Sequence, residues 1–462
     1  MSKADLFDYT DYLEFEKTSN IFSIRNDKNI YLWDIFRSDV FDEWYFNSLQ
    51  RDKPQKKLTV KKVSKLFRIS NYIGIFKAFL FLFFNKKTFN NFFYLATRNQ
   101  YKESFIDQNC YDIYQTLTGE KNLLFESFRN NSKGVNTYKD KLQFAKYYKI
   151  LIKLLYHPHL SSNDKECIKN IVAIVNTAYP IRNLQITELE ILLVNFYRDV
   201  FLYKKLFTNH SIKKVFLSQN GYQKGMFYAA KKMNVAVCEF QHGVIRKEHL
   251  AYSYPEIRDI QNYLCIPENL LTFSAYWTSL FYCPIKSVVL GNNYFSKEVV
   301  KTETPNAILV ISAFSFGHQL ADCILSACKA KVFNENKVVF KLHPHEYEDR
   351  KFYENLFQDD NVEVITDEYS VNTLLANAKL MITVNSTAVY EALQSNTRVG
   401  LYAIPPYEQM EPLFTDKNLF LFNNIEELKA GMNAELPADY KAPVFFEKCT
   451  PEKIEAALKI NE

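Results

Sequence analysis

The hydrophobic pattern of this 462-residue chain changes near residue 213. Beyond that point, short apolar and β-branched runs alternate with stretches of helical spacing. The runs cover residues 213–218, 235–240, 270–274, 287–291, 307–312, 337–342, 362–366, 380–384 and 398–402. Such runs are typical of parallel sheets buried on both faces, whose ligands bind at the carboxyl ends of the strands. We therefore predict an α/β protein with two parallel-sheet domains.

The first 200 residues show mostly helical spacing and are rich in aromatic residues, Lys and Asn. The pattern predicts an amphipathic helix over 142–156 and another over 187–207, with Thr187 as N-cap and Glu190 closing a capping box. The apolar run from 73 to 84 is too short to span a bilayer, which needs about 20 residues. We interpret it as a buried helix. A membrane-surface contact is the alternative, because Lys86 and Lys87 follow directly.

A polar stretch with a proline at 305, residues 296–306, separates two blocks of strands and helices. We take it as an interdomain linker. The predicted organisation is an N-terminal domain over 1–296 with a helical elaboration, and a C-terminal domain over 307–440. Residues 441–462 end in a helix that begins at Thr450-Pro451, and we expect it to pack back on the N-terminal domain.

Charge and cysteine content narrow the class of protein. Lys and Arg number 57 against 52 Asp and Glu, a net charge of +5 that fits an anionic small ligand or membrane surface and gives little reason to expect nucleic acid. The eight cysteines form no C-x-x-C pair, which indicates reduced thiols. The N-terminus is acidic and has no apolar core of a signal peptide. We expect a cytoplasmic protein.

Polar side chains follow five of the predicted strands at the point where each strand ends. Chance would scatter them along the strands, so their clustering is the strongest argument for a site. The candidate residues at these strand ends, with the glycine and the proline that accompany them, are Gln219 and Asn220, then Gln241 and His242, then Ser312, Ser315 and Gly317, then His343 and Pro344, and finally Asn385, Ser386 and Thr387.

Three of these strand ends are candidate phosphate sites. His343 could donate to a phosphate oxygen with Lys341 nearby, or simply cap an exposed strand end. The loop 312–318 and the segment 385–387 each precede a helix, so their hydroxyls could cradle a phosphate or serve as ordinary N-caps. Glu391 lies one turn further on, where it could accept hydrogen bonds from a ribose diol or be a solvated carboxylate.

Gln241-His242-Gly243 is the best catalytic candidate, because an imidazole at a strand end can act as a general base. Arg246 and Glu248 follow in a segment that contacts substrate or forms a solvated loop. Five of the ten glycines (Gly221, Gly225, Gly243, Gly291 and Gly317) lie near strand ends, where backbone turns tightly or approaches a ligand. The sequence contains no P-loop, no dinucleotide fingerprint and no metal-ligand spacing, so we expect no cofactor and a metal-independent site.

Three stretches carry a resemblance to a known family. FLSQNGYQKGMFYAAKKMNVAVCEFQHG resembles the end of the N-terminal domain of bacterial capsule and surface-polysaccharide glycosyltransferases of the GT-B fold. VVFKLHPHE and LMITVNSTAVYEAL resemble their nucleotide-binding domain. Sialyltransferases, Kdo transferases and CDP-glycerol glycerophosphotransferases share these elements in this order, and the resemblance covers roughly residues 210–405. It implies two Rossmann-like domains facing a cleft.

The resemblance also implies roles. His343, Ser386 and Thr387 would hold the donor phosphate, Glu391 would lie near the ribose, and His242 would face the acceptor, assisted by Gln219, Asn220 and Arg246. A carboxylate motif that serves as base in the sialyltransferases is not found here, so His242 or Glu248 would take that role. The expected activity is sugar transfer from a nucleotide-activated donor, such as a CMP-linked one, to a glycan or lipid-linked glycan at the inner face of the cytoplasmic membrane. Alternatives are CDP-alditol phosphate transfer, sugar-nucleotide epimerisation and a non-catalytic scaffold of polysaccharide assembly.

Overall fold

The computed structural model describes residues 9–49, 69–96, 99–101, 104–127, 135–136, 138, 140, 142–218, 221–246, 249–280, 283–313, 316–334, 336–358, 360–405 and 407–459. The chain forms two compact units. The first comprises 1–272, 277–290 and 449–462, and the second comprises 273–276 and 291–448. The stretch 296–306 belongs to the second unit, where the Lys301 ammonium donates to the carbonyls of Leu375 (2.8 Å) and Ala378 (3.0 Å).

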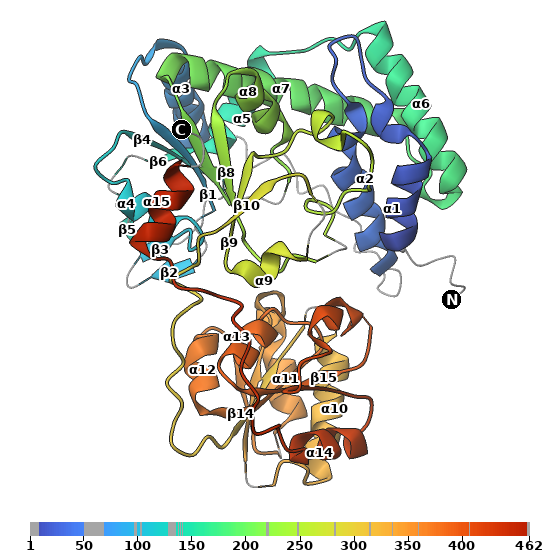
Figure 1. The fold of residues 1–462 in the computed structure, drawn as a ribbon, viewed down its shortest axis with the longest axis vertical. Helices are drawn as coiled ribbons and strands as arrows, with labels where there is room; N and C mark the ends of the chain where they lie inside the picture. Colours follow the sequence, from blue (N-terminus) through green and yellow to red (C-terminus); the bar gives the residue numbers. More distant parts are fainter. Residues whose placement is uncertain are drawn as a thin grey trace. The chain divides into compact units, whose positions relative to one another are not determined.

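A seven-stranded parallel sheet forms the centre of the first unit (Figure 1). Its order is β10-β9-β8-β7-β1-β4-β6. The strands are β1 (Asn91–Leu95), β4 (Asn122–Glu126), β6 (Leu142–Phe144), β7 (Lys214–Leu217), β8 (Ala236–Phe240), β9 (Asn269–Thr272) and β10 (Lys286–Val289). A small three-stranded sheet beside it contains β2 (Asn99–Tyr101), β3 (Ser104–Ile106) and β5 (Val135–Asn136).

Side chains alternate between two buried faces of this first sheet. Phe92 and Val215 pack with the long helices on one face, and Phe93 and Phe216 pack with the short helices on the other. Burial on both faces explains why the strands read as continuous apolar runs. The helices of this unit are α1 (Tyr9–Thr18), α2 (Leu32–Leu49), α3 (Ile69–Phe84), α4 (Tyr111–Thr116), α5 (Ala145–Leu155), α6 (Ser162–Ala178), α7 (Ile186–His210), α8 (Lys224–Lys232) and α15 (Pro451–Lys459), and the short helix α9 (Ala275–Thr278) is divided between the two units.

The C-terminal helix α15 lies on the short-helix face of the first sheet. Its Ile454 and Ala457 join the cluster around Phe93, and the Lys214 ammonium of β7 donates to the Leu458 carbonyl at 2.6 Å. The last residues of the chain therefore complete the core of the unit in which the chain begins.

A six-stranded parallel sheet forms the centre of the second unit, in the order β13-β12-β11-β14-β15-β16. Its strands are β11 (Ala307–Ile311), β12 (Lys337–Lys341), β13 (Val362–Ile365), β14 (Ala378–Thr383), β15 (Arg398–Tyr402) and β16 (Leu419–Phe422). Its helices are α10 (Gly317–Lys329), α11 (Arg350–Leu356), α12 (Val371–Asn377), α13 (Ala388–Gln394) and α14 (Ile425–Asn433). The predicted fold class, two Rossmann-like parallel-sheet units with additional helices, is confirmed.

All nine strands predicted beyond residue 213 are present, but the interpretation of the first 200 residues needs correction. That region supplies β1, β4 and β6 to the first sheet, and the predicted helix over 142–156 begins as the strand β6. The second predicted helix is α7, and its capping box uses Gln185 and Glu188 rather than Thr187 and Glu190. Among the described residues, none of the helices is long and apolar enough to cross a membrane.

Candidate active site

Each sheet has one point where the order in which strands are added reverses. It lies between β1 and β7 in the first sheet and between β11 and β14 in the second. The connections that leave the two neighbouring strands there run toward opposite faces of the sheet. Ligands of open α/β sheets bind in the resulting crevice, at the carboxyl ends of the strands. The topology therefore marks one candidate binding edge in each unit, and we describe the two separately.

In the second unit, the loops after β11 and β14 flank this crevice. The Thr383 hydroxyl at the end of β14 donates to the Ile311 carbonyl at the end of β11 (2.8 Å). The Ser312 amide that follows donates to the Lys341 carbonyl of β12 (2.9 Å). These bonds hold the ends of three neighbouring strands together, so the residues that follow them leave the sheet at one place.

A compact polar cluster lies beneath the loop after β11. The Tyr353 hydroxyl donates to Glu346 Oε1 (2.9 Å), and the His343 amide donates to Glu346 Oε2 (3.1 Å). A Cβ atom on Gly317 would stand 2.0 Å from Glu346 Oε1 and 2.5 Å from the Ser312 hydroxyl oxygen. Only a glycine fits at this position, so the start of α10 can approach the His343 turn closely.

The His343 ring has a defined hydrogen-bonding role. Its Nδ1 accepts from the His345 amide (3.2 Å), so the neutral imidazole carries its proton on Nε2. Burial lowers the pKa of His343 below its ordinary value, which keeps the ring neutral at pH 7. His343 therefore provides an Nε2–H donor at the end of β12. Pro344 begins the short 3₁₀ turn after it, which the Glu346 carboxylate caps.

Lys341 and the loop after β14 are also engaged within the unit. The Lys341 ammonium donates to the Thr366 carbonyl, which joins the ends of β12 and β13, and burial lowers its pKa. The side-chain amide Nδ2 of Asn385 donates to Gln409 Oε1 (3.1 Å). The Ser386 hydroxyl accepts from the Ala388 amide (3.3 Å), whereas Thr387, the N-cap residue of α13, is exposed and makes no side-chain capping bond.

Glu391 is not a solvated carboxylate. Its side chain is half-buried on α13, and burial raises its pKa to about 7. The Glu391 carboxylate also acts on the Tyr294 phenol, whose pKa rises through burial and through this charge. Near neutral pH, Glu391 can therefore either accept or donate a hydrogen bond.

In the first unit, polar groups gather at the end of β8. Glu239, which is 1% exposed, accepts from the Tyr252 hydroxyl at 2.7 Å, and burial raises its pKa to about 8. The Gln241 side chain donates to the Gly243 carbonyl (2.8 Å) and shapes the turn that carries His242. Sequence reasoning missed Glu239 and Tyr252, although a lone carboxylate inside the run VAVCEF was a signal.

The segment after this turn folds back toward it. The His249 ring packs against the Tyr252 ring at a tilt of 31°, with ring centroids 4.9 Å apart. Burial, and then the charges of His242 and Arg246, lower the pKa of His249 to about 3. The His249 ring is therefore neutral at pH 7, and its backbone amide donates to the Arg246 carbonyl (3.0 Å). The predicted residues His242 and Arg246 both lie in this segment, while the predicted residues Gln219, Asn220, Glu248 and Ser315 lie outside the described residues.

Two buried ion pairs support this segment from the N-terminal helices. Arg37 of α2 pairs with Glu16 of α1 (2.6 Å, both side chains fully buried) and donates to the carbonyls of Leu250 and Ser253. Lys224 at the start of α8 pairs with Asp34 of α2 at 2.9 Å. Helices far away in the sequence therefore position the turn that carries Arg246 and His249.

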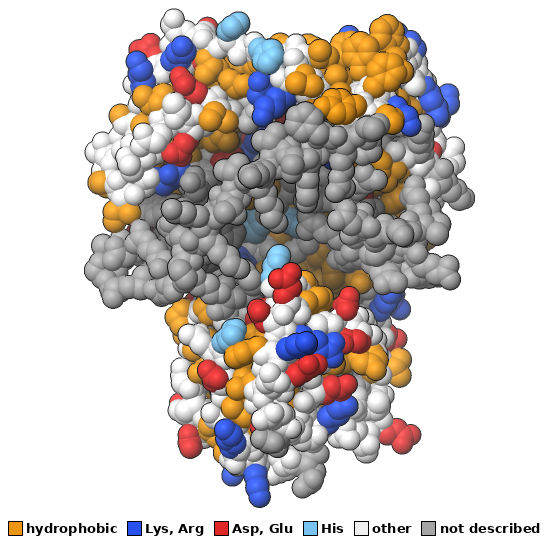
Figure 2. Space-filling view, turned by 180° about the vertical axis from the view of Figure 1, so that it is seen from behind, with side chains coloured by type: hydrophobic (Ala, Val, Ile, Leu, Met, Phe, Trp, Pro, Cys, Tyr) orange, Lys and Arg blue, Asp and Glu red, His pale blue; other side chains and the backbone are white. Residues whose placement is uncertain are grey.

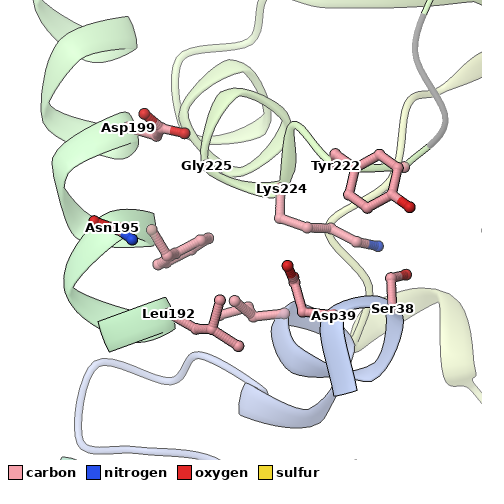
Figure 3. A pocket seen from close by; sticks show the side chains of 11 residues that line it. Ser38, Asp39, Leu192, Asn195, Asp199, Tyr222, Lys224 and Gly225 are labelled. Atoms are coloured by element: carbon pink, nitrogen blue, oxygen red, sulfur yellow. The ribbon is translucent and has the colours of Figure 1, made fainter. Parts of the chain in front are cut away.

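A pocket of about 190 Å³ opens beside α8 (Figure 3). Ser38 and Asp39 of α2 and Asn195 and Asp199 of α7 line it, together with Lys224. Gly225 allows α8 to approach α7 here, because a Cβ on it would stand 2.6 Å from the Asp199 Cβ. Among the described residues, His, Cys, Asp and Glu side chains form no group of three that could hold a metal ion.

Comparison with known proteins places part of the chain in context. Residues 299–434 match the model of a family described as Capsule polysaccharide biosynthesis protein. The matched region lies within the second unit and contains Ser312, His343 and Glu391. It confirms the resemblance to capsule polysaccharide proteins for this part of the chain. No curated protein matches the sequence.

Solved structures that match the chain include a UDP-GlcNAc 2-epimerase and MurG. UDP-GlcNAc 2-epimerase from Methanocaldococcus jannaschii has a TM-score of 0.46 at 12% identity, over 80% of this chain and 99% of that one. Acinetobacter baumannii MurG has a TM-score of 0.41 at 11% identity, over 74% of this chain and 89% of that one. The fold class itself rests on the two parallel sheets described above.

Proposed function

We propose that this protein is a glycosyltransferase of capsule or surface-polysaccharide synthesis, which moves a sugar from a nucleotide-activated donor to a glycan hydroxyl. One observation carries the proposal. Ser312, Gly317 and His343 follow β11 and β12 and lie close together, and Glu391 lies on the helix that follows β14, all inside the region that matches the capsule family model.

In this proposal the second unit holds the donor nucleotide. His343 donates its Nε2–H to a phosphate oxygen, a bond that strengthens as negative charge develops on the departing nucleotide. Glu391, in its carboxylate form, accepts hydrogen bonds from the ribose diol. Gly317 lets the start of α10 approach the His343 turn closely, which brings the Ser312 hydroxyl near that turn.

The first unit supplies the base. The acceptor oxygen forms a bond to the anomeric carbon while the bond from that carbon to the phosphate oxygen breaks, and the nucleotide leaves with the bonding electrons. His242 takes the proton of the acceptor hydroxyl. Arg246 offers a positive charge in the same turn, and the neutral His249 adds none.

The test is donor binding followed by transfer. The full-length protein is incubated with CMP-, CDP-, UDP- and dTDP-linked donors, and its melting temperature is measured. We expect one donor class to stabilise it, and His343→Ala to abolish the shift. The exposed surface residue His159, changed to Ala, is the matched control and should keep it.

The second step separates binding from chemistry. With a glycan acceptor, His242→Ala should keep the thermal shift and lose transfer by about a hundredfold or more. Unchanged turnover in that variant would exclude His242 as the base. Phosphorus in the product would instead indicate alditol-phosphate transfer, and inversion at C2 of the donor without an acceptor would indicate epimerisation. Absence of binding by any donor would overturn the proposal.

A further inference from the structure

Helix α3 is apolar on both of its sides. Between 69 and 84 its single charged residue is Lys77. One side faces the core, where Ala78 and Leu82 are 2% and 0% exposed. The opposite side carries Tyr72, Phe76 and Phe84, which are 56%, 60% and 65% exposed. Spacing by multiples of four residues places these three side chains along one line of the helix.

A surface helix normally carries polar residues on its solvent side, because exposed apolar area is unfavourable in water. The interpretation of this run as a buried helix is therefore only half right. Its buried side follows from packing in the first unit, but its exposed aromatic side has no such explanation. Contiguous exposed apolar patches mark binding surfaces.

The neighbouring helix α5 extends the patch. A Cβ on Gly74 would stand 2.5 Å from the Tyr147 ring, so the two helices approach closely at this point. Between them lies a groove of about 520 Å³, lined by the apolar or aromatic side chains of Ile73, Leu80, Phe81, Leu142, Phe144 and Tyr147 and by the polar side chains of Lys77, Asn85 and Gln143. Leu154 and Leu155 at the end of α5 are 61% and 52% exposed. We call the exposed side of α3, the groove and the end of α5 the α3–α5 face.

The charged residues of the two segments that form the α3–α5 face are all lysines. Residues 69–90 and 142–156 contain no Asp or Glu, and they contain Lys77, Lys86, Lys87, Lys146, Lys149 and Lys153. Of these, Lys149 pairs with Asp199 of α7 at 3.4 Å. Figure 2 shows hydrophobic side chains gathered at the upper right, with Lys and Arg side chains at their border.

We propose that the α3–α5 face docks on the surface of an anionic phospholipid bilayer. Aromatic and aliphatic side chains enter the boundary between headgroups and acyl chains, and the surrounding lysines contact the phosphates. The helix has 16 residues, too few to cross a bilayer, so it lies on the membrane. A protein partner would not need exposed aromatic side chains bordered by lysines alone, with no carboxylate in the same segments. The inference does not depend on the proposed transferase activity.

The test is co-sedimentation of the full-length protein with vesicles, in the absence of any sugar nucleotide. We expect binding to vesicles of phosphatidylcholine that contain phosphatidylglycerol, and little binding to phosphatidylcholine alone. Phe76→Ser with Phe84→Ser should weaken partitioning by about tenfold or more, because the inserted apolar area is lost. The control Ile191→Ser, at a 62% exposed position of α7, should bind as the wild type does.

Charge is tested with a second pair of variants. Lys86→Gln with Lys87→Gln should weaken partitioning about fivefold per lysine and reduce its dependence on salt. Lys329→Gln with Lys351→Gln, at exposed positions of the second unit, is the matched control. Unchanged melting temperatures would show that these variants fold.

Two results would overturn the proposal. The first is failure of the wild type to sediment with phosphatidylglycerol vesicles at low salt. The second is a self-association, measured by light scattering without lipid, that Phe76→Ser abolishes, because the face would then cover a second copy of the chain. Loss of vesicle binding in the α3 variants with unchanged donor binding would support it.

Discussion

The two sheet ends obtain their polar groups in different ways. In the second unit, the groups at the end of β12 are held by bonds between near neighbours in sequence, such as His343 with Glu346 and Glu346 with Tyr353. In the first unit, the turn that carries Arg246 and His249 is held by Arg37, more than 200 residues away. A locally organised site is visible in the sequence. A site supported by distant helices depends on the whole unit folding.

This difference can be measured because all three tryptophans, Trp33, Trp44 and Trp277, lie in the first unit. Their fluorescence reports the unfolding of that unit, whereas circular dichroism reports both units. A perturbation confined to one unit should therefore separate the two signals.

The largest effect should follow from breaking the buried ion pair of α1 and α2. Arg37→Met leaves the Glu16 carboxylate buried beside the Trp33 indole N–H (2.7 Å) but without its charge partner, which costs about 3–5 kcal/mol. We expect an earlier tryptophan-detected transition in urea and retained donor binding in the second unit. Arg37→Met combined with Glu16→Leu should recover part of the loss. Equal destabilisation of both units by Arg37→Met would contradict the comparison.

The next effect concerns the pH dependence of the first unit. Glu239 has a pKa of about 8 in the folded protein and an ordinary value of 4.5 when unfolded. Between these pH values the folded state holds a proton that the unfolded state releases, so stability falls as pH rises through this window and levels off above pH 8. Glu239→Gln should remove this slope and stabilise the unit at pH 8 by a few kcal/mol. The measurement is tryptophan-detected urea unfolding from pH 5 to 9, and a slope that persists in the variant would exclude Glu239 as its source.

A smaller effect should distinguish two glycines. Gly317→Ala places a methyl group against Glu346, Ser312 and Tyr353, and overpacking of this kind costs about 1–3 kcal/mol. Gly243→Ala meets no atom within 4 Å and does not require a left-handed backbone. We expect a lower melting temperature for the first variant and no change for the second. Loss of transfer in Gly243→Ala at unchanged stability would show that a ligand approaches this turn.

The smallest effect is the pH dependence of donor binding. If the carboxylate form of Glu391 accepts from the ribose, donor affinity should rise as the group ionises through its pKa of about 7. The ionised fraction grows about tenfold between pH 6 and 8, and affinity should follow it. Titration calorimetry at both pH values measures the rise, and Glu391→Gln should abolish it. An unchanged rise in the variant would assign it to another group.

Several features of the second unit were predictable from the sequence. Its strands are rich in β-branched residues, and polar residues follow them. Because the strands are parallel, the residues that follow them in the sequence lie at one edge of the sheet. The exceptions are instructive. Lys341 was expected at the phosphate but donates to the Thr366 carbonyl, and Glu346 was not expected to organise the His343 turn.

The first 200 residues were harder to interpret because their central strands β1 and β4 lack β-branched residues. The strands β1 and β4 read NFFYL and NLLFE. Phe, Tyr and Leu fit a helix core as well as a buried strand, so periodicity cannot separate the two structures. The prediction that glycines near strand ends form tight turns holds for some of them and not for others. Gly221 and Gly291 have the left-handed backbone expected of tight turns, whereas Gly243 does not.

The sequence by itself determined the parallel strands beyond residue 213 and the chemical groups at their ends, because both follow from side chains close together along the chain. Only the tertiary structure decided what supports those groups. Arg37 with Glu16, Lys224 with Asp34, and the exposed side of α3 depend on which helices meet. Long-range contacts of this kind leave no periodicity in the sequence, since each partner's position is set by the packing of an entire unit.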